Sequence, residues 1–555
     1  MNYQFIQTYD LTDEQIEELI KPTIDEINDV LGGDYRKSIL FLKGMFLNDD
    51  NIDIIDCDFI KALMIDKSMI NDPFVRNKIH QMIKKRINEA KTSVVKISGN
   101  FSIVSGDPYA LCQHIFKTEE KGSLNYGLLK EGESYNKYWI DKNVEKVACY
   151  RAPMTCHNNI RILKMPNKKD VDRWEQIQKW YKYMNTVTIF NCWDTAAHAL
   201  NGLDKDSDSV LTTNTPVLVE NTLELPAIMC VQRKAPKIVI TEESLIQANI
   251  NSFGDAIGTT TNHITSMIEV MSQFSKDSEE YKILDYRVKC GQLYQQNAID
   301  KTKGIIAKPM PKYWYDRSVN KIDEKDSEEI KIKKRFNQSI VADKKPYFMN
   351  YIYPQQKTIY EKYINNTNKK SMREFGLSMQ ELINKPNKTK IEKEFIRYYY
   401  LKMPVGINNC VCNRICWRFE QEFNGYLSKI KPTLEFDYSI LKYETTYSVR
   451  HFNMISKLYE SYIRQVQDYM QLAKSQRLEK DDVQLCRETM KQNIQMECFK
   501  ICNNEEQLCN IVLDLCYQKN TSKQFAWDVC GDLIIQRLLQ KNNYIINYPI
   551  QNDGA

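Results

Sequence analysis

Three aspartates at alternate positions, Asp204, Asp206 and Asp208, constrain this chain of 555 residues more than any other feature. At neutral pH the three carboxylates repel one another, so the segment folds only where a multivalent cation neutralises them or where water screens them. Apolar residues flank the triplet, with Cys192-Trp193 before it and Val217-Leu218-Val219 after it. This setting favours a metal site on a strand–loop–strand element, and oxygen ligands favour Mg²⁺ or Ca²⁺ over zinc.

Four interpretations of the triplet compete. An EF-hand calcium loop also begins with alternating acids, but it needs Gly at its sixth position and Glu at its twelfth, where this chain has Ser209 and Thr215. The segment 206–209 is similar to the Asp-Thr-Asp-Ser hairpin of family-B DNA polymerases, but the earlier Asp segment of those enzymes is not found upstream. The triplet alone leaves two interpretations open, a solvated acidic turn and a nucleotidyl-transfer site.

Three further segments favour nucleotidyl transfer. They are Ile103-Val-Ser-Gly-Asp-Pro-Tyr-Ala110, Tyr150-Arg-Ala-Pro-Met-Thr-Cys-His157 and Ala298-Ile-Asp-Lys-Thr-Lys-Gly304. The second resembles the Arg-Ala-Pro-Thr-Leu-His segment of multisubunit RNA polymerases and the Arg-x-Pro segment of eukaryotic RNA-silencing polymerases. The triplet resembles the Asp-x-Asp-Gly-Asp loop of the same superfamily. The third segment resembles a helix end of the silencing-type polymerases, and the first resembles the strand and turn that open this region.

The resemblance implies a fold and a reaction. The fold is α+β, with a double-psi β-barrel that carries the triplet and a large, mainly helical C-terminal portion. The reaction is template-directed RNA synthesis, in which an RNA 3′-hydroxyl attacks the α-phosphate of a nucleoside triphosphate (NTP). The template is RNA or single-stranded DNA, and the sequence does not distinguish them. The single-chain RNA polymerases of phages and prophages belong to this superfamily and are the kind that the chain resembles.

Roles for individual residues follow from the same resemblance. The three aspartates would be catalytic and would hold Mg²⁺, with a second ion arriving on the triphosphate. Arg151 would contact the incoming nucleotide near its sugar, and a structural ion pair is the alternative for this residue. Lys301 and Lys303 would meet phosphates of the substrate or the nucleic acid. The alternative is that they complement the dipole at the end of a helix capped by Gly304.

Two residues depart from the superfamily pattern. Ser207 stands where the family has Gly, which adopts positive φ more readily. Lys205 stands where the family usually has an apolar residue, and its ammonium would neutralise charge meant for metal if it turned into the triplet. The alternative function is therefore a non-catalytic nucleic-acid-binding subunit derived from the same fold.

Hydrophobic periodicity divides the chain into five segments. The only strand-rich part must hold the barrel, and a charged part without apolar periodicity indicates a linker. The segments are a helical 1–93, the barrel over 94–240, a helical 241–315 with one long helix over 277–303, a charged linker over 316–345, and a helical 346–555. The first segment is too helical and too short for the superfamily's other barrel. Either a partner polypeptide supplies that barrel or the chain is a reduced form.

Composition sets the expected surroundings. The net charge is +5 and the sequence pI is about 8.3, a mild basicity that suits a nucleic-acid channel. No apolar stretch approaches the length that spans a bilayer, and the N-terminus lacks a basic segment leading into an apolar core. We therefore expect a cytoplasmic protein without membrane contact, whose 16 cysteines are reduced thiols.

Two residue clusters allow both a functional and a packing interpretation. Cys498, Cys502, Cys509 and Cys516 recur at helical spacing, which favours a buried stripe over a zinc site. The tyrosine-rich segment 347–353 would stack bases in a nucleic-acid site, but core packing is favoured here as well.

Overall fold

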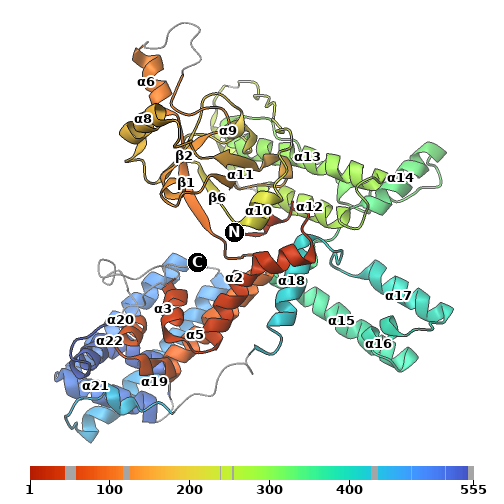
Figure 1. Ribbon diagram of the computed structural model, residues 1–555. Coiled ribbons are helices and arrows are strands. Elements are labelled where there is room, and N and C mark those ends of the chain that lie inside the picture. Colours follow the sequence, from red (N-terminus) through yellow and green to blue (C-terminus); the bar gives the residue numbers. More distant parts are fainter. Residues whose placement is uncertain are drawn as a thin grey trace. The chain divides into compact units, whose positions relative to one another are not determined.

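The computed structural model describes residues 1–43, 58–116, 126–237, 239–252, 256–426, 435–476, 478–518 and 521–547. The chain forms two compact units (Figure 1). The first consists of Met1–Thr23 and Asn88–Glu422, and the second of Ile24–Ile87 and Phe423–Ala555. Among the described residues, no helix has both the length and the apolar character needed to cross a membrane.

The first unit contains a six-stranded sheet. Its strands are β1 (Gly99–Gly106), β2 (Ser134–Asn136), β3 (Lys146–Tyr150), β4 (Arg161–Lys164), β5 (Val187–Phe190) and β6 (Ser209–Thr213). They lie in the order β2-β5-β1-β6-β3-β4, and of the five strand pairs that the structure describes, β1–β5 is parallel and the other four are antiparallel. A bridge between Glu133 and Lys164 connects the two ends of this order, and the Lys164 N–H donates to Gly132 O at 3.1 Å. The sheet is thus a nearly closed barrel.

All six strands lie within the expected barrel segment, which confirms its strand-rich character. Short helices alternate with the strands because polar and turn residues interrupt each apolar run. They are α6 (Pro108–Phe116), α7 (Lys137–Asp141), α8 (Val171–Tyr181), α9 (Ala196–Ala199) and α10 (Pro216–Glu220). Towards the end of that segment, among the described residues of 227–240, there is no strand and an isolated bridge pairs Lys234 with Ile305.

The barrel interior is apolar with a few satisfied polar groups. Val104, Val147 and Val210 point inward from three neighbouring strands and pack around Trp139, which is fully buried. The Trp139 indole N–H donates to Thr212 Oγ1 at 2.8 Å, so this large side chain is buried without an unsatisfied donor.

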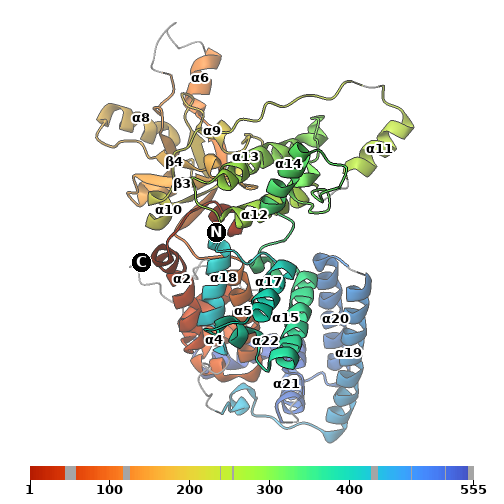
Figure 2. The same ribbon diagram turned by 90° about the vertical axis from the view of Figure 1, so that its right-hand side faces the viewer.

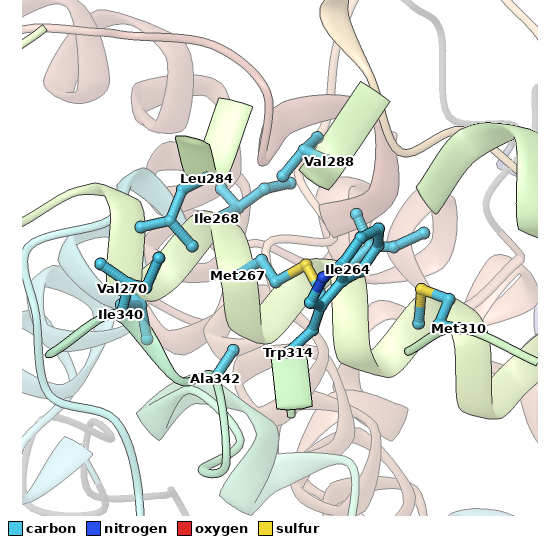
Figure 3. Packing of buried hydrophobic residues seen from close by; sticks show 10 residues of the cluster. All are labelled: Ile264, Met267, Ile268, Val270, Leu284, Val288, Met310, Trp314, Ile340 and Ala342. Atoms are coloured by element: carbon cyan, nitrogen blue, oxygen red, sulfur yellow. The ribbon is translucent and has the colours of Figure 1, made fainter. Parts of the chain in front are cut away.

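Helices α12 (Ala256–Met271), α13 (Glu279–Ile299) and α14 (Glu328–Ile340) lie side by side and enclose a second apolar core (Figures 1 and 2). Figure 3 shows Trp314 against Met267 and Ile264 in this core. Gly291 of α13 permits the close approach, since a Cβ there would lie 2.7 Å from Ile264 Cγ1. Helix α13 confirms the long helix expected over 277–303.

Helix α14 corrects the expectation of an unstructured linker over 316–345. Ser327 caps its N-terminus by accepting the Ile330 N–H, and its apolar contacts come from Phe336 and the fully buried Ile340. Two inward-facing residues are too few to produce a visible period in a charged segment. The helix is therefore set by packing on α12 and α13 more than by its own sequence.

The remaining helices of the first unit, in chain order, are α1 (Tyr3–Ile6), α11 (Glu242–Ser252), α15 (Pro354–Phe375), α16 (Met379–Asn384), α17 (Lys390–Lys402) and α18 (Val411–Glu422). Helix α2 (Asp13–Leu31) and helix α5 (Pro73–Lys91) each have residues in both units. They agree with the helical character expected of segment 1–93. Within the segment 346–555, which was expected to be helical, residues 427–434 lie outside the described residues.

The second unit is helical wherever the structure describes regular elements in it. Besides parts of α2 and α5, it holds α3 (Tyr35–Lys43), α4 (Asp58–Ile65), α19 (Val449–Gln476), α20 (Lys480–Ile501), α21 (Glu505–Leu513) and α22 (Lys523–Lys541). The four regularly spaced cysteines are all buried, which confirms the packing interpretation. They come from successive elements and not from one helix, because the chain leaves the helical conformation at Cys502.

A buried carboxylate holds a turn against α12. Glu269 is 1% exposed, and its Oε1 accepts the Asn408 N–H at 2.6 Å. Gly406 passes so close that a Cβ there would lie 2.4 Å from Glu269 Oε2. Burial raises the pKa of Glu269 to about 7, against the lowering effect of the Asn408 hydrogen bonds.

We expect α14 to be a packed helix. Ile340→Ala should lower the free energy of unfolding of this helix by about 2 kcal/mol or more, because a fully buried isoleucine loses its contacts. Ile332→Ala, on the same helix but 63% exposed, should change little. Hydrogen exchange of amides 328–340 measures both: the first variant should exchange roughly 30-fold faster, the second at the wild-type rate. Equal rates in the two variants would contradict the packing.

The raised pKa of Glu269 predicts a pH-dependent stability. The folded state keeps the proton after the unfolded chain has lost it, so this stabilisation is full below about pH 4.5 and is lost as pH rises to about 7. Glu269→Gln should remove this loss, which is on the order of 3 kcal/mol. Thermal melting of the wild type and the variant at pH 5 and pH 8 checks this, with exposed Glu394→Gln as the control. Parallel pH profiles of Glu269→Gln and wild type would contradict it.

Candidate active site

The acidic loop, residues 200–208, joins α9 to β6. Three of its residues have positive φ: Asn201 at 58°, Gly202 at 66° and Ser207 at 93°. Ser207 therefore adopts a conformation that favours glycine. It stands at the position where the family that the sequence resembles has Gly. The loop keeps a glycine-like backbone in spite of the substitution.

An ion pair closes the loop onto the sheet. Arg151 directly follows β3 and Asp208 directly precedes β6, and these strands are paired. Arg151 Nη2 lies 2.8 Å from Asp208 Oδ2 and 3.0 Å from Oδ1, while Nη1 donates to Asn201 O at 2.7 Å. The side chains are 13% and 21% exposed. Asp208 Oδ2 also accepts the Asp204 N–H at 2.7 Å, so this carboxylate organises the loop backbone. This geometry is that of a structural ion pair, which was the alternative to a nucleotide-binding role for Arg151.

A second ion pair brings in a segment 99 residues further along. Lys303 Nζ lies 2.8 Å from Asp204 Oδ2 and 3.4 Å from Asp300 Oδ1. The hydrogen bond to Asp204 raises the pKa of the Lys303 ammonium above its ordinary value. Lys303 ends a short 3-10 helix, Asp300–Lys303, which Gly304 caps in the left-handed conformation. The capping role expected of Gly304 is confirmed.

The triplet does not converge on one point. Asp204 turns to Lys303, Asp208 turns to Arg151, and Asp206 is exposed. Over the described part of the chain, no three His, Cys, Asp or Glu side chains are arranged to hold a metal ion. Carboxylate oxygens are nevertheless the ligands that Mg²⁺ prefers, so the donor type fits. An ion at the loop would compete with Arg151 and Lys303 for the same oxygens.

Lys205 makes no ion pair with the triplet. Its ammonium lies beside Gly106 at the end of β1, where a Cβ would be 2.6 Å from Nζ. Lys205 therefore does not neutralise the triplet, although the sequence left that arrangement open. Gly106 belongs to the first of the four segments singled out in the sequence, so that segment also lies against the loop.

A buried amide network supports the loop from below. Asn201 is 2% exposed; its Nδ2 donates to Pro153 O at 2.6 Å and its Oδ1 accepts from Gln292 Nε2. Gln292 of α13 is fully buried, and its Oε1 accepts from Thr155 Oγ1 at 2.6 Å and from the Thr155 N–H at 3.2 Å. Sequence analysis missed these residues, although glutamines on a helix face that packs inward are a detectable signal.

A basic ribbon lies beside Lys303 and was also missed. The Ala235 N–H donates to Gly304 O at 2.8 Å, and the Ile306 N–H donates to Arg233 O at 2.9 Å. This pairing places the exposed Arg233 and Lys234 next to the turn that carries Lys303. The signal in the sequence is the run Arg233-Lys-Ala-Pro-Lys237. Lys301 is exposed on the same turn.

Two sites allow both a functional and a packing interpretation: His157, which could orient Arg151 or the substrate, and the tyrosine-rich segment 347–353. His157 accepts the Leu223 N–H at Nε2 (3.0 Å), and its Nδ1 lies 3.2 Å from Thr8 O; burial lowers its pKa. The hydroxyls of Tyr347 and Tyr351 both donate to Glu420, and burial raises the pKa of both phenols. The packing interpretation is confirmed for both sites.

Comparison with known proteins gives structural likenesses only. No model of a protein family matches the chain, and no curated protein matches it. Among solved structures it is similar to the RNA dependent RNA polymerase QDE-1 from Thielavia terrestris, with a TM-score of 0.40 and 10% sequence identity. The match covers 98% of this chain and 57% of that chain, so this chain spans little more than half of that polymerase. A likeness of this degree assigns no activity by itself.

The positive φ angles of the loop predict how substitutions at Ser207 and Gly202 change the stability of the protein. Ser207→Gly should stabilise the protein by up to about 1 kcal/mol relative to Ser207→Ala, because only glycine relieves φ of 93°. Gly202→Ala should destabilise it by about 1–2 kcal/mol, because φ is 66° and the new Cβ would lie 2.1 Å from Gln296 Nε2. Thermal melting of the three variants checks this. Equal melting of the Ser207 variants would contradict the assigned φ.

Proposed function

We propose that this chain is a template-directed RNA polymerase that transfers nucleotides from NTPs to an RNA 3′-hydroxyl. The observation that carries the proposal is the meeting of three distant segments at the acidic loop. Gly106 lies against Lys205, Arg151 binds Asp208, and Lys303 binds Asp204. These contacts join the segments whose sequences resemble the superfamily, although the segments are spread over about 200 residues.

The finer assignment of the fold is part of the same proposal. We place the acidic loop on a double-psi β-barrel. The single parallel pair β1–β5 and the contact between Glu133 and Lys164 that nearly closes the sheet support it.

The triplet would hold Mg²⁺, which when bound offsets the charge that develops on the entering and leaving oxygens. Asp204 and Asp208 would have to exchange their present partners for the ion. Lys303 would then be released beside the loop, next to Arg233 and Lys234. These cations suit the phosphates of the triphosphate or of the nucleic acid. Arg151 stays fixed by Asn201 O and suits a polar contact with the nucleotide sugar.

A specific observation favours the second candidate, a non-catalytic nucleic-acid-binding subunit. Two of the three carboxylates already have a basic partner, at 2.8 Å in each case. In such a subunit both ion pairs would persist, and the surrounding basic residues alone would bind nucleic acid.

Template, ion and partner belong to the proposal as well. The template is RNA or single-stranded DNA, the cofactor is Mg²⁺, and a second polypeptide would supply the superfamily's other barrel. Helices account for the regular structure described within 1–93, which leaves no described strand there for that barrel.

Nucleotide incorporation by the purified chain tests the proposal. With Mg²⁺, NTPs and RNA or DNA single strands offered in parallel, Asp206→Ala should lower incorporation by at least about 100-fold, because a metal ligand is lost. Asp206 is exposed, so its replacement should leave melting unchanged. Asp172→Ala, an exposed acid on α8 in the same unit, is the matched control and should retain full incorporation.

The two candidate functions predict different results. Incorporation that Asp206→Ala leaves intact would contradict catalysis at the triplet. No incorporation by the wild type, alone or with added candidate partners, together with equal RNA binding by wild type and Asp206→Ala, would favour the binding subunit.

A further inference from the structure

A basic groove lies at the far end of the strand that leads into Arg151. It is a cavity of about 540 Å³ between the loop after α7 and the segment after β4. Its exposed rim carries Lys146, Lys164 and Lys169 together with one acid, Glu145, and its floor includes the partly buried Val144 and Met165. Cationic side chains above an apolar floor combine a site for phosphate with a surface for a base.

Two of these lysines are held in an unfavourable arrangement. Lys146 of β3 and Lys164 of β4 are directly opposite each other in antiparallel register. Like charges at such positions destabilise a sheet. Among the described residues, no carboxylate forms an ion pair with either lysine. Glu133, which pairs with Lys164 through an isolated bridge, is bound instead by Arg173, whose Nη2 lies 3.1 Å from Glu133 Oε1.

A third lysine of the groove is anchored in place. Lys168 Nζ donates to Asn143 Oδ1 at 2.6 Å and to Ile140 O at 3.3 Å. These bonds tie the segment after β4 to the loop after α7, so the two walls of the groove are joined. The rim lysines are then free to meet a ligand without holding the walls together.

The groove is within reach of the acidic loop. Strand β3 begins at Lys146 and ends at Tyr150, and Arg151 follows. Five residues of extended chain span roughly 16 Å. A short oligonucleotide that lies along the barrel can therefore touch both places.

We infer that this groove binds the phosphate backbone of single-stranded RNA as it passes the barrel. An anion between Lys146 and Lys164 would turn a repulsive pair into an attractive arrangement, and the apolar floor would receive a base. An acidic peptide would meet the same charges but would have no group to place on that floor. The inference rests on the proposed function only for the identity of the strand, template or product.

Binding of a fluorescent single-stranded RNA to the full chain tests the groove, without Mg²⁺ or NTPs. The double variant Lys146→Gln/Lys164→Gln should bind about tenfold more weakly at 0.1 M salt, and the slope of log K against log[salt] should fall by about 1.4, because two phosphate contacts are lost. Its melting temperature should not fall, because a repulsive pair is removed.

The control removes the same charge elsewhere in the unit. Lys390→Gln/Lys393→Gln changes two exposed lysines of α17 and should leave both the affinity and the salt slope unchanged. Equal effects of the two double variants would overturn the groove as a site. A polyglutamate probe of equal charge that binds as tightly as RNA, with the same dependence on Lys146 and Lys164, would overturn its assignment to nucleic acid.

The two proposals fail separately. RNA binding that depends on the groove lysines, without nucleotide incorporation, supports the groove and counts against the polymerase. If incorporation depends on Asp206 but RNA binding does not change when Lys146 and Lys164 are replaced, the result supports the polymerase and counts against the groove.

Discussion

The ion pair between Arg151 and Asp208 is the interaction on which the candidate site depends. Three carboxylates within five residues repel one another unless counter-charge is supplied. The pairing of β3 with β6 supplies it, because Tyr150 lies opposite Leu211 and the next residue, Arg151, can reach diagonally to Asp208 just before β6. The same guanidinium holds Asn201 O, and the same carboxylate holds the Asp204 N–H. One pair thus fixes both ends of the acidic loop.

Helix α13 contributes to the loop twice. Its buried Gln292 holds the Asn201 side chain from below, and the turn that follows the helix brings Lys303 to Asp204. A buried amide that is fully hydrogen-bonded fixes a unique geometry, since each broken bond would leave an unsatisfied group. The helix itself is positioned by its core with α12, where Gly291 allows close packing. Packing between α12 and α13, away from the acidic loop, therefore determines the position of its carboxylates.

Stability and metal binding make opposite demands on these carboxylates. As the loop stands, Asp204 and Asp208 are neutralised by Lys303 and Arg151, while Asp206 faces solvent. A metal ion would have to displace at least one of these partners, and the exposed Lys303 is easier to displace than the half-buried Arg151. The polymerase and the binding subunit differ in whether this exchange takes place. Both proposals assign the lysines around the barrel to contacts with nucleic acid.

The sequence by itself determined the local features. Strands in the barrel segment, the long helix before Gly304 and the buried cysteines follow from residue periodicity and turn chemistry, which act over a few neighbours. Only the tertiary structure decided the rest. Helix α14 exists because Ile340 packs on distant helices, and the pairing of Lys303 with Asp204 spans 99 residues. The residue types of Gln292 and Arg233 are visible in the sequence, but their places beneath and beside the loop are set by contacts with distant segments. Such contacts depend on how strands and helices are brought together, and no short-range pattern encodes that.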